Sequence, residues 1–165
     1  GSYGGGPGGP NGPGVGVSPL DGLRIPRVIH QTWKGAEVPP RHERRVRSWR
    51  EKNEAYAYRL HTDADIEARV RAHHPELLEA FGKMSGIHRA DLLRYMVLYD
   101  EGGVYADIDT ECVRPVDEWM ANTGDFHNVG LIVGIEVVVG DRPDWKKYFD
   151  RPIQICQWSM ASVPR

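Results

Sequence analysis

The chain has 165 residues, a length that suggests one domain, and its 21 Lys and Arg nearly balance 23 Asp and Glu, for a formal net charge of −2. This balance argues against a general nucleic-acid or membrane-surface binder, and no apolar run reaches the roughly 18 residues of a membrane span. No signal-peptide pattern is visible, and two cysteines, Cys112 and Cys156, exclude a disulfide scaffold and a four-cysteine zinc site. We therefore expect a soluble globular domain, cut from something larger, and the sequence leaves open whether the two cysteines pair.

Residues 1–20 differ in composition from the rest of the chain. They are rich in Gly and Pro and contain no charged side chain. Such a segment buries too little apolar surface to offset its ordering entropy, so we predict a disordered leader or linker. The folded part is expected to be residues 21–165.

The first elements alternate between strand and helix. Residues 27–33 are predicted to form a strand, and two prolines then open a helix over 39–53 whose arginine-rich face is interpreted as solvated. Residues 56–61 alternate as a second strand. A helix capped by Thr62 follows and runs through His74.

The second half of the chain continues this alternation. A helix is predicted over 85–99, a strand over 104–109 and a short helix near Trp119. Residues 129–139 form a long apolar run, interpreted as a buried strand with a bend or bulge at Gly134. This order predicts an α/β fold with parallel strands, in which ligands bind beyond the carboxyl ends of the strands.

Two Asp-x-Asp motifs occur, and their positions separate them. Asp107 and Asp109 end a predicted strand and point to the same face, where two carboxylates can hold Mn²⁺ or Mg²⁺ against a diphosphate. The spacing by itself is weak, because a chain with this many aspartates contains about one such pair by chance. Asp63 and Asp65 instead lie in the first turn of a predicted helix, where acidic residues complement the helix dipole. We therefore assign the metal site to the second motif.

The helix before this motif carries a charged pair. Asp91 and Arg94 are three residues apart and so share one helical face. They are either a structural salt pair or a carboxylate and a guanidinium that grip sugar hydroxyls and neutralise phosphate charge.

At this point four ordered blocks resemble a known family, the fungal DXD-containing glycosyltransferases, and among them the initiation-specific α-1,6-mannosyltransferases of the Golgi. The blocks are IPRVIHQTW (25–33), HRADLLRYMVLYDEGGVYADIDT (88–110), VGLIVGIE (129–136) and RPIQICQWSM (151–160). The resemblance implies a GT-A-type, Rossmann-like nucleotide-sugar-binding sheet flanked by helices, a Mn²⁺ (or Mg²⁺) cofactor and GDP-mannose as donor. It further implies transfer, with retention, to an α-1,6 position on an N-glycan.

The resemblance also implies a location and partners. It places the chain in the Golgi lumen, as the lumenal part of a type II membrane protein whose anchor is absent here. A complex with other Golgi mannosyltransferases is a further expectation. Because the family's domain continues beyond residue 165, we expect an incomplete sheet with an exposed apolar flank at 129–139, weak ligand binding and little turnover.

Residue by residue, the resemblance assigns Asp107 and Asp109 to the metal and diphosphate. It assigns Asp91 and Arg94 to the donor sugar and ribose. Three residues of the first strand match a segment bordering the nucleotide base: Ile29, His30 and Trp33. For Trp33 a core aromatic is the alternative.

Three polar or aromatic residues near the end of the chain are further candidates. Glu136 interrupts an apolar strand, and is either a hydrogen-bonded structural group or a pocket residue that steadies charge at the anomeric carbon. Gln157 and Trp158 offer a hydrogen bond and a stacking face to a sugar, although a half-buried strand explains them nearly as well. The predicted catalytic residues are Asp107, Asp109, Asp91, Arg94 and Glu136.

Two rival functions stay open. One is a non-catalytic nucleotide-sugar-binding fragment. The other is a related transferase with a different donor sugar, such as a UDP-sugar, or with a sphingolipid acceptor.

Overall fold

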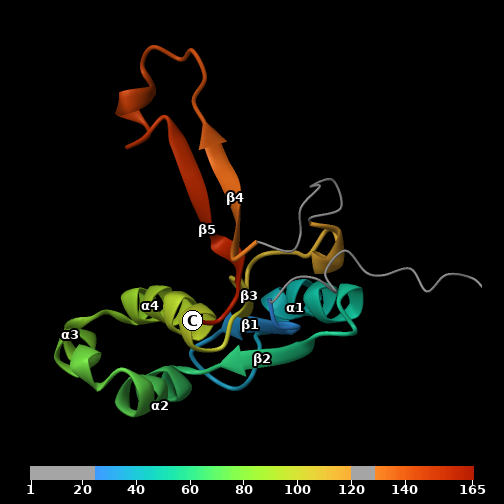
Figure 1. The fold of residues 1–165 in the computed structure, drawn as a ribbon, viewed down its shortest axis with the longest axis vertical. Helices are drawn as coiled ribbons and strands as arrows, with labels where there is room; N and C mark the ends of the chain where they lie inside the picture. The colour runs from blue at the N-terminus through green and yellow to red at the C-terminus, as the bar shows by residue number, and fades with distance from the viewer. Residues whose placement is uncertain (1–24, 120–128) are drawn as a thin grey trace, which may run out of the picture.

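The computed structural model describes residues 25–119 and 129–165 (Figure 1). The predicted leader, residues 1–20, lies outside the described residues. None of the helices in the described part is both long and apolar enough to cross a membrane.

Five strands and four α-helices make up the described fold, as Figure 1 shows. The strands are β1 (Val28–Thr32), β2 (Ala57–His61), β3 (Gly103–Ala106), β4 (Leu131–Val138) and β5 (Ile153–Ser162). The helices are α1 (Pro40–Lys52), α2 (Asp63–His73), α3 (Leu78–Lys83) and α4 (Gly86–Asp100). Short 3₁₀ turns cover Pro75–Leu77, Val116–Glu118 and Trp145–Lys147. The predicted α/β class is confirmed, and α3 was not predicted.

The strands form one sheet in the order β2-β1-β3-β5-β4. β1 pairs in parallel with both β2 and β3, but β5 runs antiparallel to both β3 and β4. The predicted parallel pairing is therefore confirmed for β1, β2 and β3, and wrong for the two pairings that β5 makes. The connection between β4 and β5 contains a 3₁₀ turn and no crossover helix, so the two strands pair as a long hairpin. This hairpin projects away from the remaining elements (Figure 1).

Local signals explain the helix boundaries. Pro39 is the N-cap of α1 and Pro40 its first residue, and the inner face of the helix buries Val46 and Trp49. α2 begins with a capping box in which Thr62 and Asp65 bond reciprocally. Both features agree with the sequence-based boundaries.

Two apolar clusters hold helices on the two faces of the sheet. On one side α2, α3 and α4 pack against Tyr105 and Met160. On the other, Trp49 of α1 packs with Val104 and Ala106. Because successive residues of β3 alternate between these clusters, all four of its residues are buried.

The turn into β3 requires glycine. Gly102 and Gly103 have φ angles of +68° and +98°, which lie in the left-handed region. A Cβ at Gly103 would also lie 2.5 Å from Cγ1 of Val28. These two glycines therefore allow β3 to enter the sheet close beside β1.

The apolar run at 129–139 does not form a buried strand. Most residues of β4 are exposed, with Ile135 at 68 % and Leu131 at 57 %, so that prediction is wrong while the expectation of an exposed apolar flank holds. The predicted irregularity at Gly134 is confirmed by a register shift between Val133 and Ile135. Both cysteines are buried free thiols.

Candidate functional site

A cavity of about 530 Å³ lies where β1, β2 and β3 end. Its walls come from the residues that follow each of these parallel strands and from the first turns of α4. They are Thr32, Trp33, Lys34, Asp63, Gly86, Ile87, Ala90, Asp91, Arg94, Asp107, Ile108 and Asp109. This is the edge of the sheet at which α/β folds bind ligands.

Asp107 follows β3 directly and is held on one side by two donors. Its Oδ1 accepts a hydrogen bond from the Tyr105 hydroxyl (2.7 Å) and another from the guanidinium of Arg94 (3.2 Å). The side chain is 30 % exposed, and burial raises the pKa of its carboxyl, against the opposing effects of Tyr105 and Arg94. These bonds fix the orientation of the carboxylate at the cavity wall.

Arg94 links the helix to the motif. Its guanidinium lies 2.8 Å from Oδ1 of Asp91, is bonded to Asp107 and stacks over the ring of Tyr105. The side chain is 5 % exposed, and its Nε has no hydrogen-bond partner among the described residues. The Asp91–Arg94 salt pair therefore forms, and it forms inside the candidate site. Because Arg94 forms ion pairs with two carboxylates, we interpret it as a residue that positions Asp107.

Asp109 lies in a turn and not on the face of a strand. β3 ends at Ala106, and the Asp107 carbonyl accepts hydrogen bonds from Thr110 and from the Gln31 side chain, so the expectation that both aspartates share a strand face is wrong. Both nevertheless line the cavity. The Asp109 side chain is exposed and makes no hydrogen bond or ion pair to the described residues.

The two carboxylates fit a hard divalent cation. Carboxylate oxygens are the ligands that Mg²⁺ and Mn²⁺ prefer, and such ions commonly take one or two of them and complete their shell with substrate phosphates and water. Within the described residues, no group of three or more His, Cys, Asp or Glu could hold an ion by itself. A cation at Asp107 and Asp109 would thus depend on a phosphate-bearing ligand.

Cationic and aromatic side chains gather beyond the end of β1. Trp33 is half-buried and lines the cavity, and the ring of His42 meets it edge-on at 5.1 Å. The charges of Lys34 and Arg41 lie 5.9 and 5.5 Å from the Trp33 ring centroid. Burial lowers the pKa of His42, which therefore stays neutral near pH 7. Of the three predicted first-strand residues, Trp33 is the one the structure brings to the site.

Ile29 and His30 are not cavity residues. Ile29 packs in the core beneath α1. His30 is fully buried, donates from Nε2 to the Gly102 carbonyl (3.0 Å) and accepts at Nδ1 from Nε2 of His61 (2.9 Å). Burial and His61 lower the pKa of His30 to about 4. Because β1 is covered on both faces, neither side chain lies on the cavity wall, and their contact with the nucleotide stays a prediction.

Glu136, Gln157 and Trp158 also lie outside this cavity. Glu136 is exposed on the projecting hairpin, so its carboxylate needs no protein partner, and Gln157 accepts a hydrogen bond from the Tyr95 hydroxyl. Trp158 is 41 % exposed and lines a separate hollow of about 420 Å³ along β4 and β5. The strand register explains why Trp158 lines a different hollow. Residues 156–159 of β5 bulge opposite Gly134, the single residue between Val133 and Ile135.

Two polar residues of the site were not predicted. Gln31 is fully buried, donates to the Asp107 carbonyl (3.1 Å) and accepts from the Tyr58 hydroxyl (2.8 Å). Its signal in the sequence is a polar residue near the end of an apolar strand. Asp63 lines the cavity although the sequence assigned it only to the helix dipole, and Asp65 completes the capping box with Thr62.

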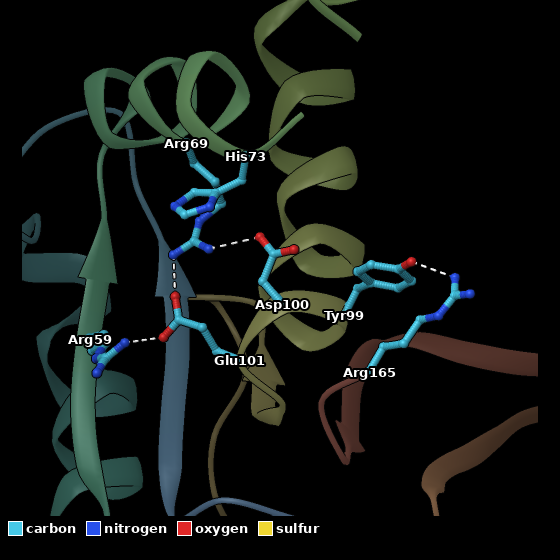
Figure 2. Close-up of a pocket in the computed structure, with 7 residues that line it drawn as sticks. All are labelled: Arg59, Arg69, His73, Tyr99, Asp100, Glu101 and Arg165. Atoms are coloured by element: carbon cyan, nitrogen blue, oxygen red, sulfur yellow. Dashed lines mark hydrogen bonds and ion pairs between the residues drawn. The ribbon is translucent and has the colours of Figure 1, made fainter. Parts of the chain in front are cut away.

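A second cavity, of about 720 Å³, contains an ion-pair network (Figure 2). Arg69 pairs with both Asp100 and Glu101, and Arg59 pairs with Glu101. Arg165 donates to the Tyr99 hydroxyl nearby. These contacts join β2 and α2 to the end of α4, away from the strand ends that carry the aspartates, so we interpret the network as structural.

Comparisons with known proteins agree with this site. The family described as "Glycosyltransferase sugar-binding region containing DXD motif" matches residues 39–124. The initiation-specific alpha-1,6-mannosyltransferase of Candida albicans is 36 % identical over 150 residues, which cover 84 % of this chain and 39 % of that protein. Inositol phosphoceramide mannosyltransferase 3 of Schizosaccharomyces pombe is 36 % identical over 94 residues, which cover 56 % of this chain and 26 % of that protein. The chain thus spans less than half the length of these curated relatives.

The fold can also be superposed on a solved structure, "PaToxG Glycosyltransferase", with a TM-score of 0.49 and 14 % sequence identity. The superposed part covers 85 % of this chain and 56 % of that chain. The family match contains both Asp107 and Asp109, which line the cavity at the carboxyl edge of the sheet. The chain belongs to the family of glycosyltransferases that share this DXD-containing sugar-binding region.

Proposed function

We propose that this chain carries the donor site of a metal-dependent mannosyltransferase that uses GDP-mannose and extends an N-glycan through an α-1,6 linkage with retention. One observation carries the proposal. Asp107, oriented by Tyr105 and Arg94, shares a cavity wall with an unpaired Asp109 at the carboxyl edge of the sheet. Support for mannose comes from the relatives, which are mannosyltransferases.

The side chains of the cavity suit a nucleoside diphosphate. Asp107 and Asp109 would hold Mn²⁺ or Mg²⁺, which supplies Lewis-acid stabilisation of the charge on the leaving diphosphate. Lys34 brings a positive charge to the same wall, and the first turn of α4 at Gly86 presents the positive end of its dipole. Asp91, 41 % exposed beside Arg94, is placed to accept hydrogen bonds from donor hydroxyls.

The proposed reaction is a front-face displacement. The acceptor hydroxyl forms a bond to the anomeric carbon, the bond from that carbon to the diphosphate oxygen breaks, and the leaving phosphate takes the hydroxyl proton. This route rests on the family resemblance, and it needs no covalent nucleophile from the chain. The chain's contribution is then orientation and charge stabilisation.

Ligand-dependent thermal stability tests the donor. GDP, GDP-mannose, UDP and UDP-glucose are compared with and without Mn²⁺, because a ligand that binds the folded state raises the melting temperature. We expect the largest shift with GDP-mannose and Mn²⁺, and loss of that shift in Asp109→Asn but not in Glu136→Gln. A larger shift with UDP-glucose would reassign the donor, and equal shifts without metal would remove the proposed role of the two aspartates.

Turnover and acceptor need a separate experiment. Transfer of mannose to an α-mannoside and to inositol phosphoceramide is measured side by side, since the similarity to inositol phosphoceramide mannosyltransferase 3 favours the lipid as a second candidate acceptor. Binding without transfer to either would support a non-catalytic nucleotide-sugar-binding function. The Golgi lumen as the site of action is part of the proposal and rests on the resemblance.

A further inference from the structure

We propose that Asp63 is a ribose contact, a carboxylate that accepts hydrogen bonds from the 2′- and 3′-hydroxyls of the nucleotide donor. The inference rests on the proposed use of this cavity for a nucleotide. It starts from a difference between two neighbouring aspartates at the beginning of α2. Both lie in the first turn of the helix, but one of them alone lines the cavity.

Asp65 is fully engaged in capping. Its Oδ2 accepts hydrogen bonds from the Thr62 amide (2.8 Å) and the Thr62 hydroxyl (2.7 Å), and these bonds lower the pKa of its carboxyl. Asp63 is exposed, and its side chain makes no hydrogen bond or ion pair with the described residues. Because Asp65 completes the capping box, the helix leaves the Asp63 carboxylate available to a ligand.

The sheet order places Asp63 on one side of the cavity. Asp63 follows β2, Trp33 follows β1 and Asp107 follows β3, in the order β2-β1-β3. Neighbouring strands lie about 5 Å apart, so Asp63 and Asp107 stand on the order of 10 Å apart along the edge. A diphosphate bound at Asp107 and Asp109 therefore extends its nucleoside half past Trp33 toward Asp63.

The chemistry of the wall identifies the group that Asp63 meets. Trp33 and Ile87, the latter 77 % exposed, supply apolar faces on which a base can lie. A carboxylate repels phosphate and accepts hydrogen bonds, so neighbouring hydroxyls suit it best. The other charged groups of the wall suit the phosphates, because Lys34 is cationic and Arg94 offsets the charge of Asp107.

Isothermal titration in Mn²⁺ tests the inference on matched variants, Asp63→Ala and Asp65→Ala. Both remove one carboxylate from the same helical turn. We expect Asp63→Ala to weaken GDP and UDP equally, by about tenfold, since ribose is common to both. It should leave 2′,3′-dideoxy-GDP unaffected. Asp65→Ala should lower the melting temperature and leave all three affinities unchanged.

Each other outcome overturns the inference in an identifiable way. A loss for GDP without a loss for UDP would make Asp63 a base contact, and an equal loss for the dideoxy nucleotide would make its effect structural. Unchanged GDP affinity in Asp63→Ala would remove the contact. Failure of the wild-type chain to bind any nucleotide would overturn the proposed function as well.

Discussion

Mild acid should destabilise this protein through a buried pair of histidines. His30 is completely buried and fully hydrogen-bonded as a neutral ring, with His61 as donor on one side and the Gly102 carbonyl as acceptor on the other. Burial, and then the neighbouring His61, lower the pKa of His30 from 6.5 to about 4. Protonation would break the bond from His61, because both ring nitrogens would then be donors.

The sign and size of the effect follow from linkage. Between pH 6.5 and 4 the unfolded chain binds a proton at this residue that the folded chain does not, so the free energy of unfolding falls as the pH falls. Each unit of difference between the folded and unfolded pKa changes the free energy of unfolding by about 1.4 kcal/mol. The lowered pKa of His30 therefore reduces the free energy of unfolding by about 3 kcal/mol in full, and by about 2 kcal/mol between pH 7 and pH 5. His42 and His61, whose pKa values are also lowered, act in the same direction. Asp65 and Glu101 also have lowered pKa values, but they reduce the free energy of unfolding below about pH 4.5, outside the range from pH 7 to pH 5.

Urea unfolding followed by tryptophan fluorescence at pH 7, 6 and 5 measures the effect, with His30→Gln as the comparison. A glutamine amide can accept from His61 and donate to the Gly102 carbonyl, but it does not titrate. The wild type should lose about 2 kcal/mol more than the variant between pH 7 and pH 5. Equal losses would refute the reasoning.

The same variant tests the predicted nucleotide contact of His30. Because His30 lies in the core and not on the cavity wall, His30→Gln should bind GDP with Mn²⁺ as the wild type does at pH 7. A large loss of affinity in a variant that remains folded would restore the nucleotide contact implied by the sequence resemblance.

Three further outcomes are expected. Asp109→Asn should abolish Mn²⁺-dependent GDP binding in titration without lowering the melting temperature, while Glu136→Gln, outside the cavity, should bind normally; parallel losses would place the hairpin carboxylate in the site. Arg94→Met should reduce the free energy of unfolding in urea by about 3 kcal/mol, because it leaves a partly buried carboxylate unpaired, and unchanged stability would show that these ion pairs contribute nothing. Thr62→Ala should lower stability by about 1 kcal/mol with GDP affinity unchanged, and a binding defect would mean that the cap also orders the cavity.

Features set by neighbouring residues were predictable from the sequence. The helix cap at Thr62 and the prolines that begin α1 each depend on local backbone chemistry, and each lies where it was expected. The Asp91–Arg94 pair was predictable for the same reason, since helical spacing places the two side chains on one face.

Features set by pairing at a distance were not predictable. The antiparallel direction of β5 and its bulge at 156–159 depend on register with β3 and β4, which no local pattern encodes. Although the Trp158 carbonyl accepts a hydrogen bond from the Asp107 amide (2.8 Å), Trp158 lines a separate hollow and not the cavity that holds the Asp107 carboxylate. Similarly, a first-turn aspartate satisfies helix capping and a cavity wall equally well, so Asp63 could be separated from Asp65 only once their contacts were known.

The charge on the cavity wall explains why the two aspartates of the motif need a cation to bind a diphosphate. Four carboxylates line it against two cationic side chains, Lys34 and Arg94, and Arg94 is already paired with Asp91 and Asp107. A bare diphosphate approaching Asp107 and Asp109 meets like charge across a partly buried surface, which opposes binding. A divalent cation reverses that repulsion, and the diphosphate in turn supplies ligands that the described residues do not. Nucleotide and metal should therefore each raise the affinity for the other by the same factor, as linkage between two sites requires.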